Sequence, residues 1–188
     1  MDALMAALVA AACAQVGDRT AWLAAILADR YRKILLVLVA AALAVALAAV
    51  GATVAGILMA SRLTPEARQL LLALALIVQG GGALFRTKPP GRLDGWKLGA
   101  AATSLVGVLA LAVGGGLPFI VLAIAARSTM PWLTPIGATI GSLAVIVPAA
   151  MLGESGWLAL PLRAARITIG MLFLIVGLTI ALGAMGLR

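Results

Sequence analysis

Six long apolar segments, separated by short polar stretches, divide the chain. They cover approximately residues 3–28, 34–60, 67–86, 97–126, 132–153 and 163–187. Each holds about 20 residues or more, enough for an α-helix to cross the ~30 Å hydrocarbon core of a membrane. Because backbone polar groups in lipid must be satisfied within the protein, we expect these segments to be helical. The pattern predicts an all-α membrane protein with six transmembrane helices.

The composition supports this class and excludes several others. Hydrophobic residues make up 64% of the chain and charged residues only 11%, whereas an ordinary soluble domain carries about 25% charged residues. We therefore expect one transmembrane domain over residues 1–188. The chain has no His, and its one cysteine, Cys13, lies in an apolar segment, which excludes a disulfide and a Cys/His metal cluster. No nucleophile–base pair or cofactor motif is visible, so neither an enzyme nor a bound cofactor is expected.

The net charge of +8 is concentrated in the short connections. With six spans, the connections after the first, third and fifth segments share one face and hold nine basic residues. These are Arg30, Arg32, Lys33, Arg86, Lys88, Arg92, Lys97, Arg163 and Arg166; the other face holds Arg62, Arg68, Arg127 and Arg188, and Arg19 lies inside the first segment. The positive-inside rule then predicts an inner-membrane protein with both termini outside the cytoplasm. The charge favours contact with the lipid bilayer over nucleic-acid binding.

The N-terminus has some features of a targeting signal. Residues 1–14 resemble the core of a signal peptide, and Ala11-Ala12-Cys13 faintly resembles a lipoprotein cleavage site. However, Asp2 precedes the core where Lys or Arg would be expected, and the apolar run continues past Gly17. We expect this segment to be retained as the first membrane helix.

Turn and cap signals place the connections. Thr64 followed by Pro65 indicates a helix that begins with a capped first turn. Residues 86–97 form the longest polar stretch and contain a Pro-Pro-Gly sequence, so they are expected to be a central cytoplasmic loop. Shorter loops are expected over residues 128–131 and, between the fifth and sixth helices, over residues 154–163.

The two halves of the chain resemble each other. Residues 50–54 (VGATV) recur as residues 136–140 (IGATI), and residues 23–28 recur loosely as residues 121–126. Three helices per half would give the halves opposite orientations in the membrane. We therefore expect an inverted repeat, with repeat one over about residues 1–88 and repeat two over about 98–188. Transporters built in this way bind their substrate between the halves near the midplane.

The stretch from Gln15 to Thr20 is the most polar part of the first segment. An ionisable residue at this depth is costly in free energy, which makes Asp18 a candidate functional residue. Gln15 lies three residues before Asp18 and so shares its helix face, and Thr20 adds a hydroxyl. Oxygen ligands of this kind suit hard cations such as Ca²⁺, Mg²⁺ and Mn²⁺. The alternative is that Asp18 pairs with Arg19, or that both lie at the membrane interface.

Glycine-rich runs occur in the third, fourth and fifth segments. Residues 80–82, together with Gly137 and Gly141, are expected to allow close helix packing. The run from Gly114 to Pro118 is expected to break its helix, and broken helices are tolerated where they line a cavity.

These residues resemble a known family. The chain is similar to bacterial full-length members of the GDT-one family (UPF 0016), cation/proton exchangers linked to Mn²⁺ and Ca²⁺. The family has two three-helix halves, each opening with E-x-G-D-[KR]-[ST]. Here the first motif reads QVGDRT over residues 15–20, and residues 137–141, 148–154 and 160–163 are similar to the family's fifth helix and following loop.

The departures from the family pattern matter for function. Gln15 replaces the first motif's Glu, and the second motif, expected at about residues 112–117, reads AVGGGL. Of the four carboxylates that the resemblance implies, only Asp18 remains. We therefore predict a divalent-cation (Mn²⁺ or Ca²⁺) transporter or cation/proton antiporter with Asp18, Gln15 and Thr20 as metal ligands. The alternative is a divergent relative without cation exchange, acting as a structural partner or moving another small solute.

Overall fold

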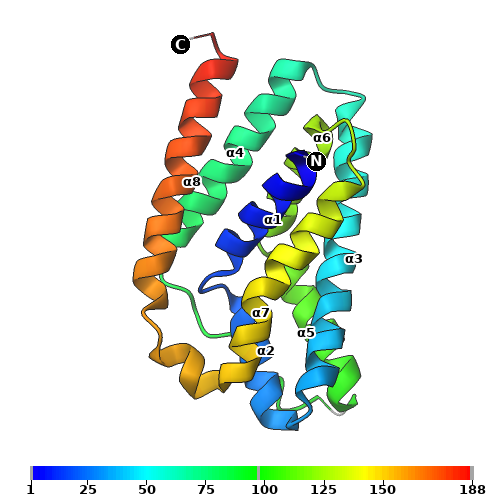
Figure 1. The fold of residues 1–188 in the computed structure, drawn as a ribbon, viewed down its shortest axis with the longest axis vertical. Coiled ribbons are helices and arrows are strands. Elements are labelled where there is room, and N and C mark those ends of the chain that lie inside the picture. Colours follow the sequence, from blue (N-terminus) through cyan, green and yellow to red (C-terminus); the bar gives the residue numbers. More distant parts are fainter. Residues whose placement is uncertain (1, 97, 187–188) are drawn as a thin grey trace.

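Eight helices make up the fold in the computed structural model, which describes residues 2–96 and 98–186 (Figure 1). They are α1 (Asp2–Gln15), α2 (Arg19–Tyr31), α3 (Ile34–Ala60), α4 (Pro65–Leu84), α5 (Gly99–Gly114), α6 (Leu117–Arg127), α7 (Leu133–Ala159) and α8 (Leu162–Ala184). The part of the chain that the structure describes contains no strand. The all-α prediction is therefore confirmed.

Two of the six predicted segments are broken in the structure. The first is divided into α1 and α2, and the fourth into α5 and α6, which are bent by 65° relative to each other. Helices α3, α4, α7 and α8 are each long and apolar enough to cross a membrane, and the α5–α6 pair makes a fifth candidate span. The 14 residues of α1 are too few to cross alone. The chain is a multi-pass membrane protein.

The connections largely follow the sequence signals. Thr64 caps α4 by accepting a hydrogen bond from the backbone N–H of Ala67 (3.3 Å), and Pro65 occupies the first turn as predicted. The loop expected over residues 154–163 is wrong, because α7 continues to Ala159 beyond a kink at Gly153. The carboxylate of Asp29 accepts a hydrogen bond from the N–H of Glu154 (2.6 Å) and so caps the helical turn after the kink.

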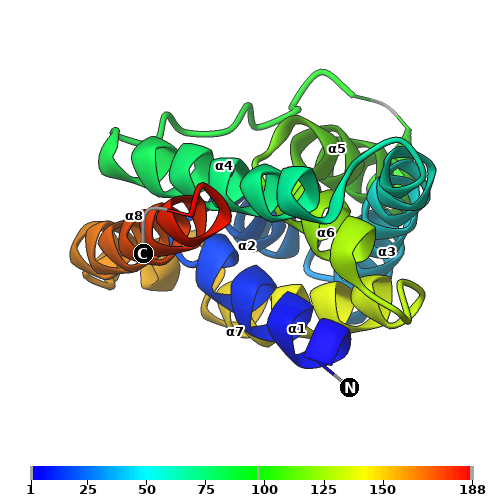
Figure 2. The ribbon, with the colours of Figure 1, turned by 90° about the horizontal axis from the view of Figure 1, so that it is seen from above.

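The two halves of the chain are packed into each other. Helix α3 packs against α5 and α6, while α7 packs against α1 and α2; α4 and α8 form a third close pair. Helices α3 and α7 thus each support the broken segment of the opposite half. The short helices that follow the breaks are the most enclosed, since α2 and α6 bury most of their residues. Helix α8 lies at the periphery beside α4 (Figure 2) and leaves most of its apolar surface exposed for lipid.

Glycines allow the closest of these contacts. Gly137 and Gly141 on α7 face the backbone carbonyls of Leu4 and Leu8 on α1, and a Cβ atom at either glycine would overlap the carbonyl oxygen. Gly51, in contrast, has open space around it. Gly80 of α4 similarly faces Gly170 of α8. The packing role predicted for Gly80, Gly137 and Gly141 is confirmed. The same prediction is wrong for Gly81 and Gly82, because a Cβ atom at either position would meet open space.

One apparent repeat match does not join equivalent positions. Gly51 lies in the C-terminal half of the 27-residue helix α3, whereas Gly137 lies in the first two turns of α7. The resemblance of residues 50–54 to residues 136–140 is therefore out of register. The looser match joins corresponding helices, because Leu23 and Val121 are each the fifth residue of their helix, α2 and α6. Its spacing of 98 residues is one residue longer than the spacing between matching residues of the two helix breaks.

The central loop is tied to the ends of two helices. The Arg30 guanidinium at the end of α2 donates to the backbone carbonyl of Leu93 (3.0 Å) and pairs with Asp94 (3.4 Å). Arg92 forms an ion pair with Glu154 of α7, which raises the pKa of this guanidinium above its ordinary value. The α2–α3, α4–α5 and α7–α8 connections lie at one end of the molecule in Figure 1. Two of the basic residues that define the predicted orientation, Lys97 and Arg188, lie outside the described residues.

The glycine contact between α1 and α7 predicts that a glycine-to-alanine substitution lowers stability at Gly137 but not at Gly51. Gly137→Ala should lower the stability by about 1–3 kcal/mol, because the added methyl overlaps the Leu4 carbonyl and overpacks the contact. Gly51→Ala is the matched control, since it has the same sequence context and open space, and should leave stability unchanged or raise it by up to about 1 kcal/mol. Thermal unfolding in detergent measures both. Equal unfolding temperatures for the two variants would contradict the α1–α7 packing.

Candidate functional site

The first break separates α1 from α2 within the polar stretch. Helix α1 ends at Gln15, and Gly17 adopts a left-handed conformation (φ 69°) that favours glycine. Asp18 then caps α2, because its carboxylate accepts a hydrogen bond from the backbone N–H of Thr20 (3.0 Å). The left-handed turn thus favours Gly at position 17, and the start of α2 favours a capping residue such as Asp at position 18.

The break changes which side chains converge. On a continuous helix Thr20 would point away from Asp18, but here Gln15, Asp18 and Thr20 all line one cavity. Gln15 is 3% exposed and Thr20 1% exposed, and Asp18 is partly buried. Arg19 is exposed, and the ion pairs among the described residues are Arg30–Asp94 and Arg92–Glu154. The alternative of an Asp18–Arg19 ion pair is therefore wrong.

The second break lies in the glycine run of the fourth segment. Helix α5 ends at Gly114 and α6 begins at Leu117, so Gly115 and Gly116 form the turn. The prediction that residues 114–118 break a helix beside a cavity is confirmed. The second break occupies the region where the family resemblance places the second motif, residues 112–117.

The two breaks meet at a cavity of about 20 Å³. Its size is close to that needed for one water-sized body. The lining residues come from both breaks and from α4: Ala14, Gln15, Asp18, Thr20, Gln79, Leu111, Ala112, Gly115, Gly116 and Leu117. The structure thus brings together all three predicted ligands and adds Gln79.

Residues that line the cavity from the first break match residues that line it from the second break. Each of the four residues from the first break has a counterpart 97 residues later in the same lining. The pairs are Ala14 with Leu111, Gln15 with Ala112, Asp18 with Gly115, and Thr20 with Leu117. One side of the cavity therefore carries an amide, a carboxylate and a hydroxyl, and the matching positions on the other side carry apolar groups or no side chain.

Gln79 is the site residue that the sequence analysis missed. It is half-buried on α4, and its side chain lies against Gly116, where a Cβ atom would overlap the amide oxygen. The absence of a side chain at Gly116 therefore makes room for Gln79. A signal existed in the sequence, since Gln79 is the only polar side chain between Gln69 and Arg86.

The chemistry available is that of oxygen donors with one negative charge. The amide oxygen of Gln15 is buried without a hydrogen-bond donor among the described residues, so an acceptor remains free at the cavity. Asp18 supplies the only carboxylate of the lining. Within the described residues, no three acidic, His or Cys side chains gather into a metal-binding group. The arrangement can accept a hard cation or a hydrogen-bond donor, with little charge to hold a divalent ion tightly.

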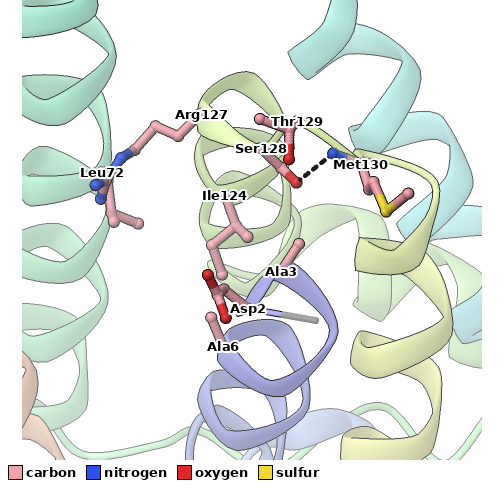
Figure 3. A pocket seen from close by; sticks show the side chains of 9 residues that line it. All are labelled: Asp2, Ala3, Ala6, Leu72, Ile124, Arg127, Ser128, Thr129 and Met130. Atoms are coloured by element: carbon pink, nitrogen blue, oxygen red, sulfur yellow. Dashed lines mark hydrogen bonds between the residues drawn. The ribbon is translucent and has the colours of Figure 1, made fainter.

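A larger cavity lies further along α1, α4 and α6. It has a volume of about 340 Å³ and is lined mainly from α1, α4 and α6 and by the following connection. Figure 3 shows Asp2 at the start of α1, while the Arg127 side chain extends toward Leu72 of α4. Three residues between the two cavities are fully or almost fully buried: Ala7 and Ala11 of α1, and Ile120 of α6. They belong to one apolar core cluster. This apolar packing separates the larger cavity from the small polar one.

Comparison with known proteins agrees with the resemblance found in the sequence. Residues 3–90 match the family model described as divalent cation/proton antiporter GDT1. The chain is also 26% identical over 183 residues to a Vibrio cholerae serotype O1 protein described as a "Putative manganese exporter", covering 96% of this chain and 91% of that protein. No solved structure matches the chain. The predicted resemblance to this family is confirmed over residues 3–90.

The unpaired amide of Gln15 predicts a stabilising substitution. Gln15→Leu should raise the stability of the protein by about 1–3 kcal/mol, because it replaces a buried unpaired acceptor with an apolar group of similar size. The matched control is Gln69→Leu, at an exposed position of α4, which should change the unfolding temperature little. Thermal unfolding without added cation measures both. A lower unfolding temperature for Gln15→Leu would show that this amide is satisfied in the folded protein.

Proposed function

We propose that this chain functions as its resemblance to the GDT1 family implies, as an inner-membrane transporter of a divalent cation, Mn²⁺ or Ca²⁺. One observation carries the proposal: two helix breaks converge on a small cavity lined by Asp18, Gln15, Thr20 and Gln79. Broken membrane helices around a polar cavity are the arrangement in which transporters bind ions. The similar Vibrio protein described as a manganese exporter favours Mn²⁺ and export.

We further propose six spans arranged as two inverted repeats, with α1–α2, α3 and α4 in repeat one and α5–α6, α7 and α8 in repeat two. The element order supports this, because each half consists of a broken segment followed by two helices. The reciprocal packing of α3 and α7 supports it as well. So does the correspondence of lining residues 97 positions apart. The central loop would lie in the cytoplasm and both termini outside.

The position of the break suits a site near the midplane. Helix α1 has 14 residues and α2 has 13, so each is about 20 Å long. The break thus lies roughly halfway through a segment that is long enough to span the membrane. Because buried apolar residues separate it from the cavity beside Asp2 and Arg127, the structure corresponds to a form closed on that side.

The roles of the residues follow from their chemistry. Asp18 would be the main ligand and the only group of the cavity able to carry a proton, while Gln15, Thr20 and Gln79 would be neutral oxygen donors. Tight oxygen sites for divalent ions use two or more carboxylates. A site with one carboxylate should therefore bind weakly and couple transport to few protons.

The same shortage of carboxylates supports a second candidate function. Without strong cation binding, the chain would be a divergent relative that moves another small solute or serves as a structural partner. Calorimetry separates the two candidates, because the transporter should bind Mn²⁺ or Ca²⁺ at millimolar concentration or below. Absence of binding to either ion would favour the second candidate.

Removal of the one charge in the cavity should abolish transport. Asp18→Asn keeps an N-cap residue of equal quality, so α2 should remain intact while the ligand loses its charge. We expect purified protein reconstituted in liposomes to transport Mn²⁺, and the variant to show no flux above that of empty liposomes. Asp94→Asn, the same change in the exposed central loop, is the control and should retain flux. Unchanged flux in Asp18→Asn would refute the site assignment.

The contact between Gly116 and Gln79 provides a test that leaves Asp18 intact. Gly116→Ala should reduce Mn²⁺ flux at least severalfold, because the methyl group would displace the amide of Gln79 from the cavity. Gly114→Ala is the control, since a Cβ atom there meets open space. Flux through the liposome membrane is measured for both at equal protein content. Equal flux in the two variants would exclude Gln79 from the transport site.

A further inference from the structure

We propose that a third, basic cavity binds the phosphate headgroup of an anionic phospholipid. This cavity has a volume of about 350 Å³ and lies where the ends of α4 and α7 meet α2 and the start of α8. Its polar lining includes Trp22, Arg86, Thr87, Arg163 and Arg166. The inference does not depend on the proposed transport function.

The charge of this cavity is unbalanced. Three arginines line it, and none of its lining residues is acidic. The two ion pairs formed among the described residues, Arg30–Asp94 and Arg92–Glu154, involve none of these arginines. Three guanidinium groups around one cavity form the kind of site that holds a phosphate, since guanidinium geometry matches phosphate oxygens.

Two N–H donors at this cavity lack partners among the described residues. Arg166 donates from one terminal nitrogen to the carbonyl of Gly82 (3.1 Å), but its other terminal nitrogen, Nη1, is buried and unpaired. The indole Nε1 of Trp22 is also buried and unpaired. Because a buried unpaired donor is costly, both groups would gain from an anionic acceptor reached by a small rotation of the side chain.

The rim of the cavity favours a lipid over a free phosphate ion. Several of its lining residues are large exposed apolar side chains, with Phe85 77% exposed. The others are Leu84, Leu158, Leu160 and Ile167. A ligand that places its phosphate among the arginines could lay its acyl chains on these side chains. Basic cavities between membrane helices bind anionic lipid headgroups in this way.

The location agrees with this ligand. The cavity is lined partly by the basic connection after α4 and by the connection after α7. It also includes the first residues of α8, whose N-terminal dipole favours an anion. Gly17 also lines it, and the Thr87 hydroxyl donates to the Gly17 carbonyl (3.4 Å). A bound lipid would therefore lie close to the α1–α2 break at Gly17.

Native mass spectrometry of the full chain, released from detergent, tests the proposal with defined lipids. The probes are phosphatidylglycerol, phosphatidylcholine with the same acyl chains, and inorganic phosphate. The wild-type chain should retain phosphatidylglycerol in preference to phosphatidylcholine, and bind it more tightly than inorganic phosphate. Affinity for phosphatidylglycerol should fall roughly fivefold for Arg86→Gln or Arg163→Gln and roughly 25-fold for the double variant.

The matched control removes the same charge at the opposite end of the molecule. Arg62→Gln combined with Arg127→Gln should leave phosphatidylglycerol binding unchanged, because neither residue lines the basic cavity. Arg86 and Arg163 are exposed, so their replacement should not disturb folding. Equal retention of the two lipids by the wild-type chain would overturn the proposal. So would an equal loss in test and control variants, or inorganic phosphate binding as tight as that of the lipid.

Discussion

The fold depends on the cost of interrupting a helix inside a membrane. Backbone N–H and C=O groups released by a break must find partners within the protein, since lipid offers none. At both breaks, neighbouring residues provide hydrogen-bond partners for released backbone groups. Asp18 satisfies the N–H of Thr20, the Asp18 N–H donates to the Gln15 carbonyl (3.1 Å), and the Gly116 carbonyl accepts from Phe119 (3.2 Å). The helices that follow the breaks, α2 and α6, are then enclosed by the long helices of the opposite half.

This arrangement links packing to function. Interlocked halves hold the two breaks face to face, and their apposition creates the small polar cavity. The cavity is asymmetric in charge, because the first break contributes Gln15, Asp18 and Thr20 while the equivalent positions of the second contribute no polar side chain. The second break adds a polar group indirectly, because Gly116 leaves room for the side chain of Gln79 from α4. The amide of Gln79 therefore lines the cavity although α4 contains neither motif.

Much of the fold could be predicted from the sequence, because apolar segment length and turn residues act locally. The six segments, the Thr64–Pro65 cap and the break after Gly114 all follow from such signals. The loop expected after residue 153 was wrong, since Asp29 of a distant helix caps the turn after Gly153 and lets α7 continue. The match between residues 50–54 and 136–140 misled for another reason: apolar sequences rich in small residues recur by chance. Gln79 escaped prediction because only the tertiary structure brings α4 beside the second break.

The central claim is that one cation binds between the two helix breaks, with Asp18 as its charged ligand. Anomalous diffraction from crystals of the protein grown with Mn²⁺ tests this claim most directly. The account predicts a manganese peak within coordinating distance, roughly 2.0–2.6 Å for hard cations, of the Asp18 carboxylate, with the Gln15 amide oxygen in the same coordination sphere. A well-ordered manganese ion bound elsewhere in the membrane region, with the space between the breaks free of metal, would contradict it.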